Sequence, residues 1–240
     1  LFTAKKSFVW NVSQTAGVAD NRERNGYENL QHMRKQKEID TKVESGMKNF
    51  VITIGREFGS GGRFIGEEVA QKLGIAYYDK DIIGQIAEQS GLSPKYIQEN
   101  AELSPKKGMF AYAFTGRDIT GKSIGDIVYE AQRKVIMEIA EKESCVIIGR
   151  NADFILKSRD DVLNVFIHGN MPEKVQRICK LYNVNESDAV KMINDTDKRR
   201  RTNYNFYTDQ KWGMADNYTL SLNSSQIGYP KCESIIMQCI

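Results

Sequence analysis

The sequence predicts an α/β fold in which a parallel sheet of about five strands carries helices on both faces. Three observations lead to this prediction. Short apolar runs rich in β-branched residues recur along the chain. Stretches with apolar residues at helical spacing separate these runs, and the chain has no internal repeat. Strands that alternate with helices are typical of a parallel sheet, because each crossover helix packs against a face of the sheet.

Five apolar runs are the predicted strands. The first, Phe50–Ile54, is β-branched and ends at a glycine, as a buried strand would. The second, Ile75–Tyr78, is short. The remaining predicted strands are Cys145–Ile148, Val162–Ile167 and Tyr218–Leu222.

The predicted helices lie between these strands. Apolar residues recur at helical spacing from Phe64 to Leu73, and Gly74 ends that run. Ile124–Lys142 has one apolar face and predicts a long amphipathic helix. Further helices are predicted at Lys80–Gln89, at Pro94–Glu102, from Pro172 onward, at Asn185–Arg201 with Ser187 as a cap, and over the last ten residues.

Two segments do not fit this alternation. Residues 1–46 are polar and mixed in charge, and we interpret them as an N-terminal extension with a short helix around Glu28–Val43. The chemical core is then expected to span residues 47–240, beginning at Met47. Residues 104–121 are rich in Gly, Ser and Lys and predict a mobile loop.

Composition argues against several classes of protein. The 240 residues are 40% hydrophobic and 27% charged, which is ordinary for a globular protein. The formal charge of +3 does not indicate a nucleic-acid binder, and no apolar run is long enough to predict a membrane span. The four cysteines form no CxxC pair, so no metal ligands are identified and free thiols in a reducing cytoplasm are expected.

A glycine-rich segment, Gly55–Arg63, joins the first strand to the first helix of the core. Glycines let successive backbone N–H groups point at one anion, and the helix N-terminus adds partial positive charge. We therefore expect Gly59, Ser60, Gly61 and Gly62 to cradle phosphate. A plain turn is the alternative, although it would need fewer glycines.

Two kinds of phosphate loop compete for this segment. The P-loop pattern GxxxxGK[ST] places a lysine on the outer phosphates, but Gly62 stands at that position here. Arg63 is the first candidate to take over the lysine's role, and Arg56 is the second.

The dinucleotide pattern GxGxxG fits Gly59 and Gly61 but meets Phe64 at its third glycine. Asp79 lies twenty residues after Gly59, where the dinucleotide pattern has an acidic residue that hydrogen-bonds the ribose. The loop alone therefore predicts nucleotide or phosphate binding without choosing between the two kinds.

Four motifs extend the pattern over the whole core: residues 52–63 (ITIGREFGSGGR), 77–80 (YYDK), 146–150 (VIIGR) and 217–225 (NYTLSLNSS). In this order they resemble the cytidylate kinase-like family of bacterial P-loop proteins. The resemblance runs from about Met47 to the C-terminus. It implies a three-layer P-loop NTPase-like fold with a helical lid at about 185–215. It also implies an enzyme that uses ATP and Mg²⁺ to phosphorylate a nucleoside monophosphate, with CMP or dCMP as the leading acceptor.

The resemblance also implies site residues. Asp79 matches an aspartate that follows the second strand in cytidylate kinases, and Gly149-Arg150-Asn151 matches their Gly-Arg-Asp, with Asp153 close by. Arg199 and Arg201 fall where lid arginines fall. The chain departs from the family by lacking the P-loop lysine and by carrying Asn151 in place of aspartate. The arginine that follows the second-strand aspartate in cytidylate kinases also has no clear counterpart.

These observations give each residue a predicted role. Arg63, Arg150, Arg199 and Arg201 are the catalytic candidates, and Arg63 joins the glycine loop in holding ATP. Arg150 would bind the acceptor's phosphate, because α/β proteins place ligand groups where a strand ends. The candidates for substrate binding are Arg56, Asp79, Arg150 and Asp153.

Structural roles without a function in binding or catalysis are alternatives to several of these assignments. Asp79 could instead cap the next helix, Arg150 could form a structural ion pair, and Arg63 could be solvated. On a continuous helix, Arg199 and Arg201 would diverge by about 200°. Tyr204, Tyr207 and Trp212 could stack on a base or pack the lid, and these alternatives are left open.

Three functions are compatible with the sequence. The first is a nucleoside-monophosphate-kinase-like phosphotransferase whose partner is a small nucleotide. The second is a regulatory nucleotide binder with weak or no catalysis, which the missing lysine favours. The third, which fits least well, is an NAD(P)-binding oxidoreductase. The oligomeric state is not predicted.

Overall fold

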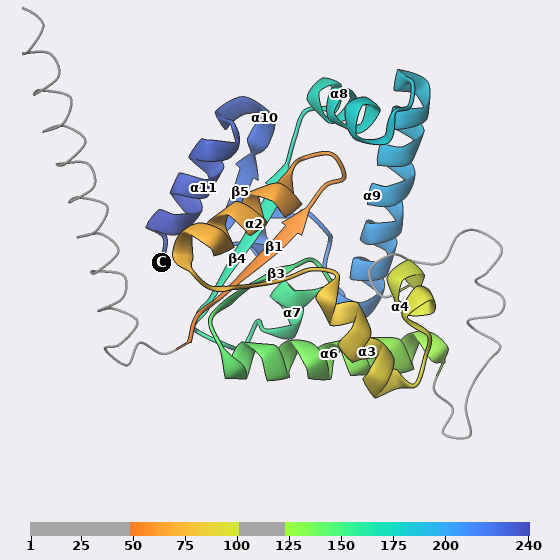
Figure 1. The fold of residues 1–240 in the computed structure, drawn as a ribbon, viewed down its shortest axis with the longest axis vertical. Coiled ribbons are helices and arrows are strands. Elements are labelled where there is room, and N and C mark those ends of the chain that lie inside the picture. Colours follow the sequence, from red (N-terminus) through yellow and green to blue (C-terminus); the bar gives the residue numbers. More distant parts are fainter. Residues whose placement is uncertain (1–48, 101–122) are drawn as a thin grey trace, which may run out of the picture. The chain divides into compact units, whose positions relative to one another are not determined.

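The computed structural model describes residues 49–100 and 123–240 (Figure 1). The predicted N-terminal extension, its helix around Glu28–Val43 and the predicted loop at 104–121 lie outside the described residues.

Five parallel strands of the described residues form one sheet in the order β2-β3-β1-β4-β5 (Figure 1). The central strand, β1, pairs on one side with β3 and on the other with β4. This arrangement confirms the predicted parallel sheet. The strands are β1 (Val51–Arg56), β2 (Ala76–Tyr78), β3 (Cys145–Ile148), β4 (Val162–His168) and β5 (Leu220–Asn223).

One face of the sheet is covered by α2 (Gly62–Leu73) and α11 (Tyr229–Gln238). Ile65 and Val69 of α2 pack there on Ile52 and Ile54 of β1, and all four side chains are fully buried. The two β1 residues are two apart, as residues on one face of a strand are. Gly74 ends α2 in the left-handed conformation, as the sequence predicts.

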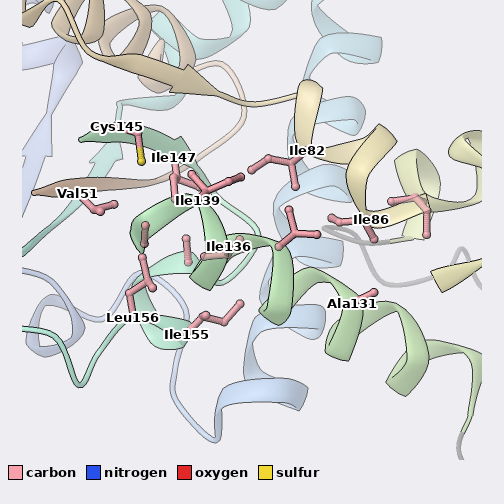
Figure 2. Packing of buried hydrophobic residues seen from close by; sticks show 14 of the residues in the cluster. Val51, Ile82, Ile86, Ala131, Ile136, Ile139, Cys145, Ile147, Ile155 and Leu156 are labelled. Atoms are coloured by element: carbon pink, nitrogen blue, oxygen red, sulfur yellow. The ribbon is translucent and has the colours of Figure 1, made fainter. Parts of the chain in front are cut away.

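The opposite face is covered by α3 (Asp81–Ser90), α4 (Pro94–Asn100), α6 (Ile124–Lys142) and α7 (Ala152–Ile155). Figure 2 shows side chains of this core, with Ile82 and Ile86 of α3 and Ile136 and Ile139 of α6 gathered against the sheet residues Val51, Cys145 and Ile147. A sheet covered on both faces gives the three layers that the sequence predicts.

Two further helices, α8 (Met171–Tyr182) and α9 (Glu186–Thr208), pack on each other. The sequence prediction places the start of α9 correctly but names the wrong cap residue and ends the helix too early. Asn185 caps the helix by accepting the Asp188 N–H, so Ser187 lies inside the first turn. The helix also continues past Arg201 to Thr208, because the sequence has no glycine or proline before Gly213 that would end it.

Short helices that the sequence did not predict follow strand ends or precede them. They are α7, the 3₁₀ helix η1 (Ala215–Asn217) and α10 (Ser224–Ile227). The segments after β1, β3, β4 and β5 all leave the same edge of the sheet, because the strands are parallel. In open α/β sheets, ligands bind at this carboxyl edge.

Candidate active site

A cavity of about 420 Å³ lies at the carboxyl edge of the sheet. The glycine loop after β1 forms part of its wall, and the start of α2, Arg150 after the end of β3, and residues at or in α3, α4, α8 and α9 contribute the rest. Glu57 is the only carboxylate residue among the described residues that line it. The cations in the lining are Arg56, Arg63, Lys80, Arg150, Arg177 and Arg200. Six cations against one acid make the cavity a site for an anion, and its volume suits a small molecule.

The glycine loop adopts a backbone that side chains would obstruct. Gly59 and Gly61 have φ angles of +85° and +81°, in the left-handed region. A Cβ on Gly61 would lie 2.5 Å from the ring of Tyr229, so this position admits only glycine. The backbone N–H groups of Gly59, Gly61 and Gly62 donate no hydrogen bond within the described part of the chain. They are therefore available to an anion at the N-terminus of α2.

One hydrogen bond within the loop and two to distant segments hold its shape. The Ser60 hydroxyl donates to the Glu57 carbonyl at 2.9 Å. The Ser224 hydroxyl, just after β5, donates to the Ser60 carbonyl at 2.7 Å. The Phe58 N–H donates to an Asp197 carboxylate oxygen at 2.7 Å. The loop is thus anchored to the end of β5 and to α9.

A buried ion network, which the sequence analysis missed, lies behind the loop. The Lys174 Nζ of α8 is 2.9 Å from Glu57 Oε2 and 3.5 Å from Asp197 Oδ2. The Arg200 Nη1 lies 3.6 Å from the other oxygen of Asp197. Burial raises the pKa of Asp197 even though Lys174 and Arg200 lie beside it. The network ties the loop to both α8 and α9.

Arg63 and Asp79 form a close ion pair beside the loop. The Arg63 Nε lies 2.6 Å from Asp79 Oδ2, and its Nη2 donates to Oδ1 at 3.1 Å. Asp79 is buried, whereas the side chain of Arg63 is half exposed. Helix α3 begins at Asp81 with Lys80 as its N-cap residue, so the carboxylate of Asp79 does not cap it. Arg63 lines the cavity, and Asp79 is not part of the lining.

Arg150 follows β3 in a strained stretch of backbone. Gly149, Arg150 and Asn151 have φ angles of +65°, +58° and +56°, and such angles are costly for the two residues that carry a Cβ. The buried Arg150 donates from Nε to the Asp79 carbonyl at 3.3 Å, and its own carbonyl accepts from Gln132 Nε2 at 2.7 Å. Strain of this kind gathers at functional sites, where the surroundings hold it in place.

Asp153 lies behind the cavity and not in its lining. Its carboxylate accepts a hydrogen bond of 2.6 Å from the Tyr204 hydroxyl, which also bonds to Gln210 at 2.9 Å. Burial raises the pKa of Asp153 to about 6. Asp153, Arg150 and Arg56 share a second, much smaller hollow of about 20 Å³.

Some of the predicted arginines line the main cavity and others do not. Arg56, Arg63 and Arg150 line the main cavity, together with Gly59, Gly61 and Gly62 of the loop. Arg199 and Arg201 are not in the lining, and the Arg201 guanidinium lies over the Trp212 ring at 5.6 Å from its centre. Arg200 lines the cavity between them and was missed. On α9 it follows Asp197 by three residues, and helical spacing from the buried Ala189 and Ile193 could have indicated that face.

Arg177 is a second cation that the sequence analysis missed. It lies on α8, lines the cavity and donates from Nη1 to the Tyr229 hydroxyl at 2.9 Å. An apolar wall lies near it, formed partly by the exposed Leu181 and Tyr182. No motif in the sequence pointed to these residues, because their helix is more than a hundred residues from the glycine loop along the chain, although the two are close in the structure.

Two kinds of feature are absent from the described ranges. No helix there has the length and apolar character needed to span a bilayer. No three His, Cys, Asp or Glu side chains within residues 49–100 and 123–240 gather as metal ligands would.

Comparisons with known proteins give the family of the chain and relatives of its fold. A family model described as "Cytidylate kinase-like family" matches residues 51–226. No curated protein matches the chain. An uncharacterized protein from Eubacterium ventriosum ATCC 27560 is 26% identical, with a TM-score of 0.62, over 80% of this chain and 98% of that one.

Two shikimate kinases are more distant in structure. The enzyme from Acinetobacter baumannii is 14% identical, with a TM-score of 0.46, over 82% of this chain and 95% of its own. The enzyme from Bacteroides thetaiotaomicron is 16% identical, with a TM-score of 0.45, over 79% and 97%. The three predicted layers, a five-stranded parallel sheet with helices on both faces, are confirmed by the structure.

Proposed function

The chain belongs to the cytidylate kinase-like family, and we propose that it is a phosphotransferase that moves the γ-phosphoryl group of ATP to a small acceptor. The acceptor we propose is a nucleoside monophosphate, with CMP or dCMP first. The observation that carries the proposal is the cavity itself, in which a glycine loop and six cations face one carboxylate.

Phosphoryl transfer needs this kind of site. The transferred group spreads negative charge over its oxygens as it moves, and catalysis consists mainly of positioning and charge stabilisation. Backbone N–H groups of Gly59, Gly61 and Gly62 would hold the donor's phosphates at the start of α2. Cations around the cavity would neutralise the charge on both substrates.

We assign the acceptor's phosphate to Arg150. Arg150 lines the cavity together with Lys80 and Gln98. The strained backbone at Arg150 fixes where the side chain begins, and the bond from its Nε to the Asp79 carbonyl orients it. A planar guanidinium can then grip a phosphate with two parallel hydrogen bonds.

The described residues fit ATP better than they fit a protein-held metal. The loop offers N–H donors to phosphate, whereas Glu57 in the cavity wall is already paired with Lys174. Mg²⁺ would therefore be held mainly by the phosphates and water, as is common for this ion. Bound in that way, it would neutralise phosphate charge.

A regulatory nucleotide binder is the second candidate. Gly62 at the position of the P-loop lysine favours it, since that lysine normally stabilises the outer phosphates. Such a protein would bind ATP in the same cavity without turnover. The two candidates therefore differ in catalysis and not in the ligand.

The test is an ADP-release assay on the full chain, with ATP, Mg²⁺ and each common nucleoside monophosphate in turn. A reaction without acceptor controls for ATP hydrolysis. ADP release that depends on one monophosphate would support the kinase and identify its substrate. ATP binding without release for any acceptor would support the regulatory binder instead. Absence of ATP binding would contradict both.

A further inference from the structure

The position of the missing lysine is occupied from another part of the chain. Gly62 is the first residue of α2 and stands where the P-loop pattern has its lysine. A Cβ built on Gly62 would lie 2.6 Å from Cβ and 3.2 Å from Cγ of Arg56. Real Cβ atoms essentially never show a contact as short as 2.6 Å, so a side chain at position 62 would have to displace the Arg56 side chain from its Cβ outward.

Arg56 is placed where an apolar residue would be expected. It is the last residue of β1 and continues the series Ile52, Ile54, Arg56 on one face of the strand. The two isoleucines are buried in the core, and Arg56 is only 5% exposed. Arginine is seldom buried to this extent without a specific use. Here it also lines the main cavity, next to the glycine loop.

Two other cations near the loop are held by carboxylates. Arg63 is bound through two nitrogens to both oxygens of Asp79. Lys174 lies between Glu57 and Asp197 and is not part of the cavity lining. Arg56 differs from both in its position, because its side chain begins directly against the place where a side chain at position 62 would begin.

We propose that Arg56 binds the phosphates of the donor nucleotide in place of the P-loop lysine. The inference rests on the proposed function, because it concerns the same loop and the same donor. It reverses the order of candidates drawn from the sequence, in which Arg63 came first. Gly62 and Arg56 then act as one pair, in which the small residue leaves room for the large one.

The first experiment measures binding of ATP and of inorganic tripolyphosphate to the full chain by titration calorimetry. Arg56→Met keeps the length of the side chain without its charge, and Arg56→Lys keeps the charge. Arg56→Met should weaken binding of both ligands about 10- to 100-fold, the scale for losing a charged hydrogen bond. Arg56→Lys should retain most of the affinity. Arg159→Met, a substitution at the far edge of the sheet, is the matched control and should bind as the wild type does.

The second experiment exploits the clash between a side chain at position 62 and Arg56. Gly62→Lys alone should lower the melting temperature, because the new side chain overlaps Arg56. The double variant Arg56→Gly/Gly62→Lys removes both Arg56 atoms, Cβ and Cγ, that a side chain at position 62 would meet. It should recover the melting temperature relative to Gly62→Lys and bind ATP at least about 10-fold more tightly than Arg56→Gly.

The outcomes separate this inference from the proposed function. Wild-type affinity in a folded Arg56→Met variant would overturn the role of Arg56 and leave the kinase proposal standing. A loss for ATP without a loss for tripolyphosphate would also overturn it, since the contact would then not be to phosphate. ATP binding that depends on Arg56, without turnover for any acceptor, would sustain the inference while the kinase proposal fails. A wild-type chain that binds neither ligand would overturn both.

Discussion

Arginines at the two edges of the sheet have different surroundings. At the amino edge, Arg159 grips Asp161 with two hydrogen bonds of 2.9 and 2.7 Å and also donates to the Ala140 carbonyl. The Asp161 carbonyl in turn accepts the N–H of Val51, where β1 begins. At the carboxyl edge, the cavity lining gathers six cations around one carboxylate residue.

The difference is between an ion pair that is complete within the protein and a cavity lining in which cations outnumber carboxylates. A pair such as Arg159 and Asp161 is complete within the protein and supports only its packing. Like charges gathered around a cavity repel one another and lower the stability of the folded state. A protein retains such an arrangement where an anionic ligand relieves the repulsion. The following experiments test how sharply the two edges differ, beginning with the largest expected effect.

Lys174→Met should produce the largest loss of stability. It removes the cation shared by Glu57 and Asp197, and Asp197 stays buried with its charge poorly compensated. Breaking a buried pair in this way costs about 3–5 kcal/mol of the free energy of unfolding. Urea denaturation at pH 8 measures the loss. Lys191→Met, which breaks an exposed pair with Asp188, should cost under about 0.5 kcal/mol. Equal losses in the two variants would show that the network behind the loop is not structural.

Asp153→Asn should stabilise the protein at neutral pH. Burial raises the pKa of Asp153 from 3.8 to about 6, so the charged carboxylate is disfavoured in the folded state. This group therefore lowers stability as the pH rises from about 4 through 6, and its full cost is present above pH 6. The variant should gain about 3 kcal/mol at pH 8.

The gain from Asp153→Asn should shrink as the pH falls through 6 and vanish below about pH 4. Urea denaturation at pH 8 and pH 4 checks both expectations. A gain that does not depend on pH would contradict the raised pKa. Asparagine still offers the Tyr204 hydroxyl an acceptor, so the packing is kept.

Arg150→Ala should lower kcat/KM for phosphoryl transfer by a factor of about 10². The expected loss follows from removing one positioned cation from the carboxyl edge. Steady-state kinetics with the acceptor identified by ADP release measures it, and circular dichroism checks that the variant is folded. Unchanged kinetics in a folded variant would remove Arg150 from the site and give it a structural role, as at the amino edge.

Arg159→Met should have the smallest effect of the four. It removes a partly exposed, two-point ion pair and should cost about 1–2 kcal/mol of the free energy of unfolding. ATP affinity should not change, because the residue lies at the opposite edge of the sheet. Thermal denaturation and calorimetric titration check the two expectations. A drop in ATP affinity in a folded variant would contradict a purely structural role for Arg159.

The sequence was most informative where a local pattern carries the structure. The strand Cys145–Ile148 and the helix Ile124–Lys142 have the predicted bounds, because an apolar run and a helical stripe each depend on nearby residues. The glycine loop was equally visible, since its backbone angles demand glycine locally.

The sequence was least informative about contacts between distant helices. The pair formed by Lys174 and Glu57 joins residues 117 apart, and no local pattern records it. Arg200 was hidden for a different reason. The resemblance to a family pointed to its neighbours Arg199 and Arg201. Which arginine of α9 faces the cavity depends instead on its helical spacing from the buried residues of that helix.

The order of the strands has a consequence for how the protein is made. The central strand, β1, leaves the ribosome early, but Val51 pairs with Cys145 and Val162, about a hundred residues later in the chain. The loop after β1 depends on still later residues, since Ser224 bonds to Ser60 and the Tyr229 ring lies against Gly61. Contacts over such separations form slowly, because long loops must close first. The glycine loop, among the first segments of the core to be synthesised, is therefore among the last to take its shape. Its backbone depends on contacts made by the last strand and helix of the domain.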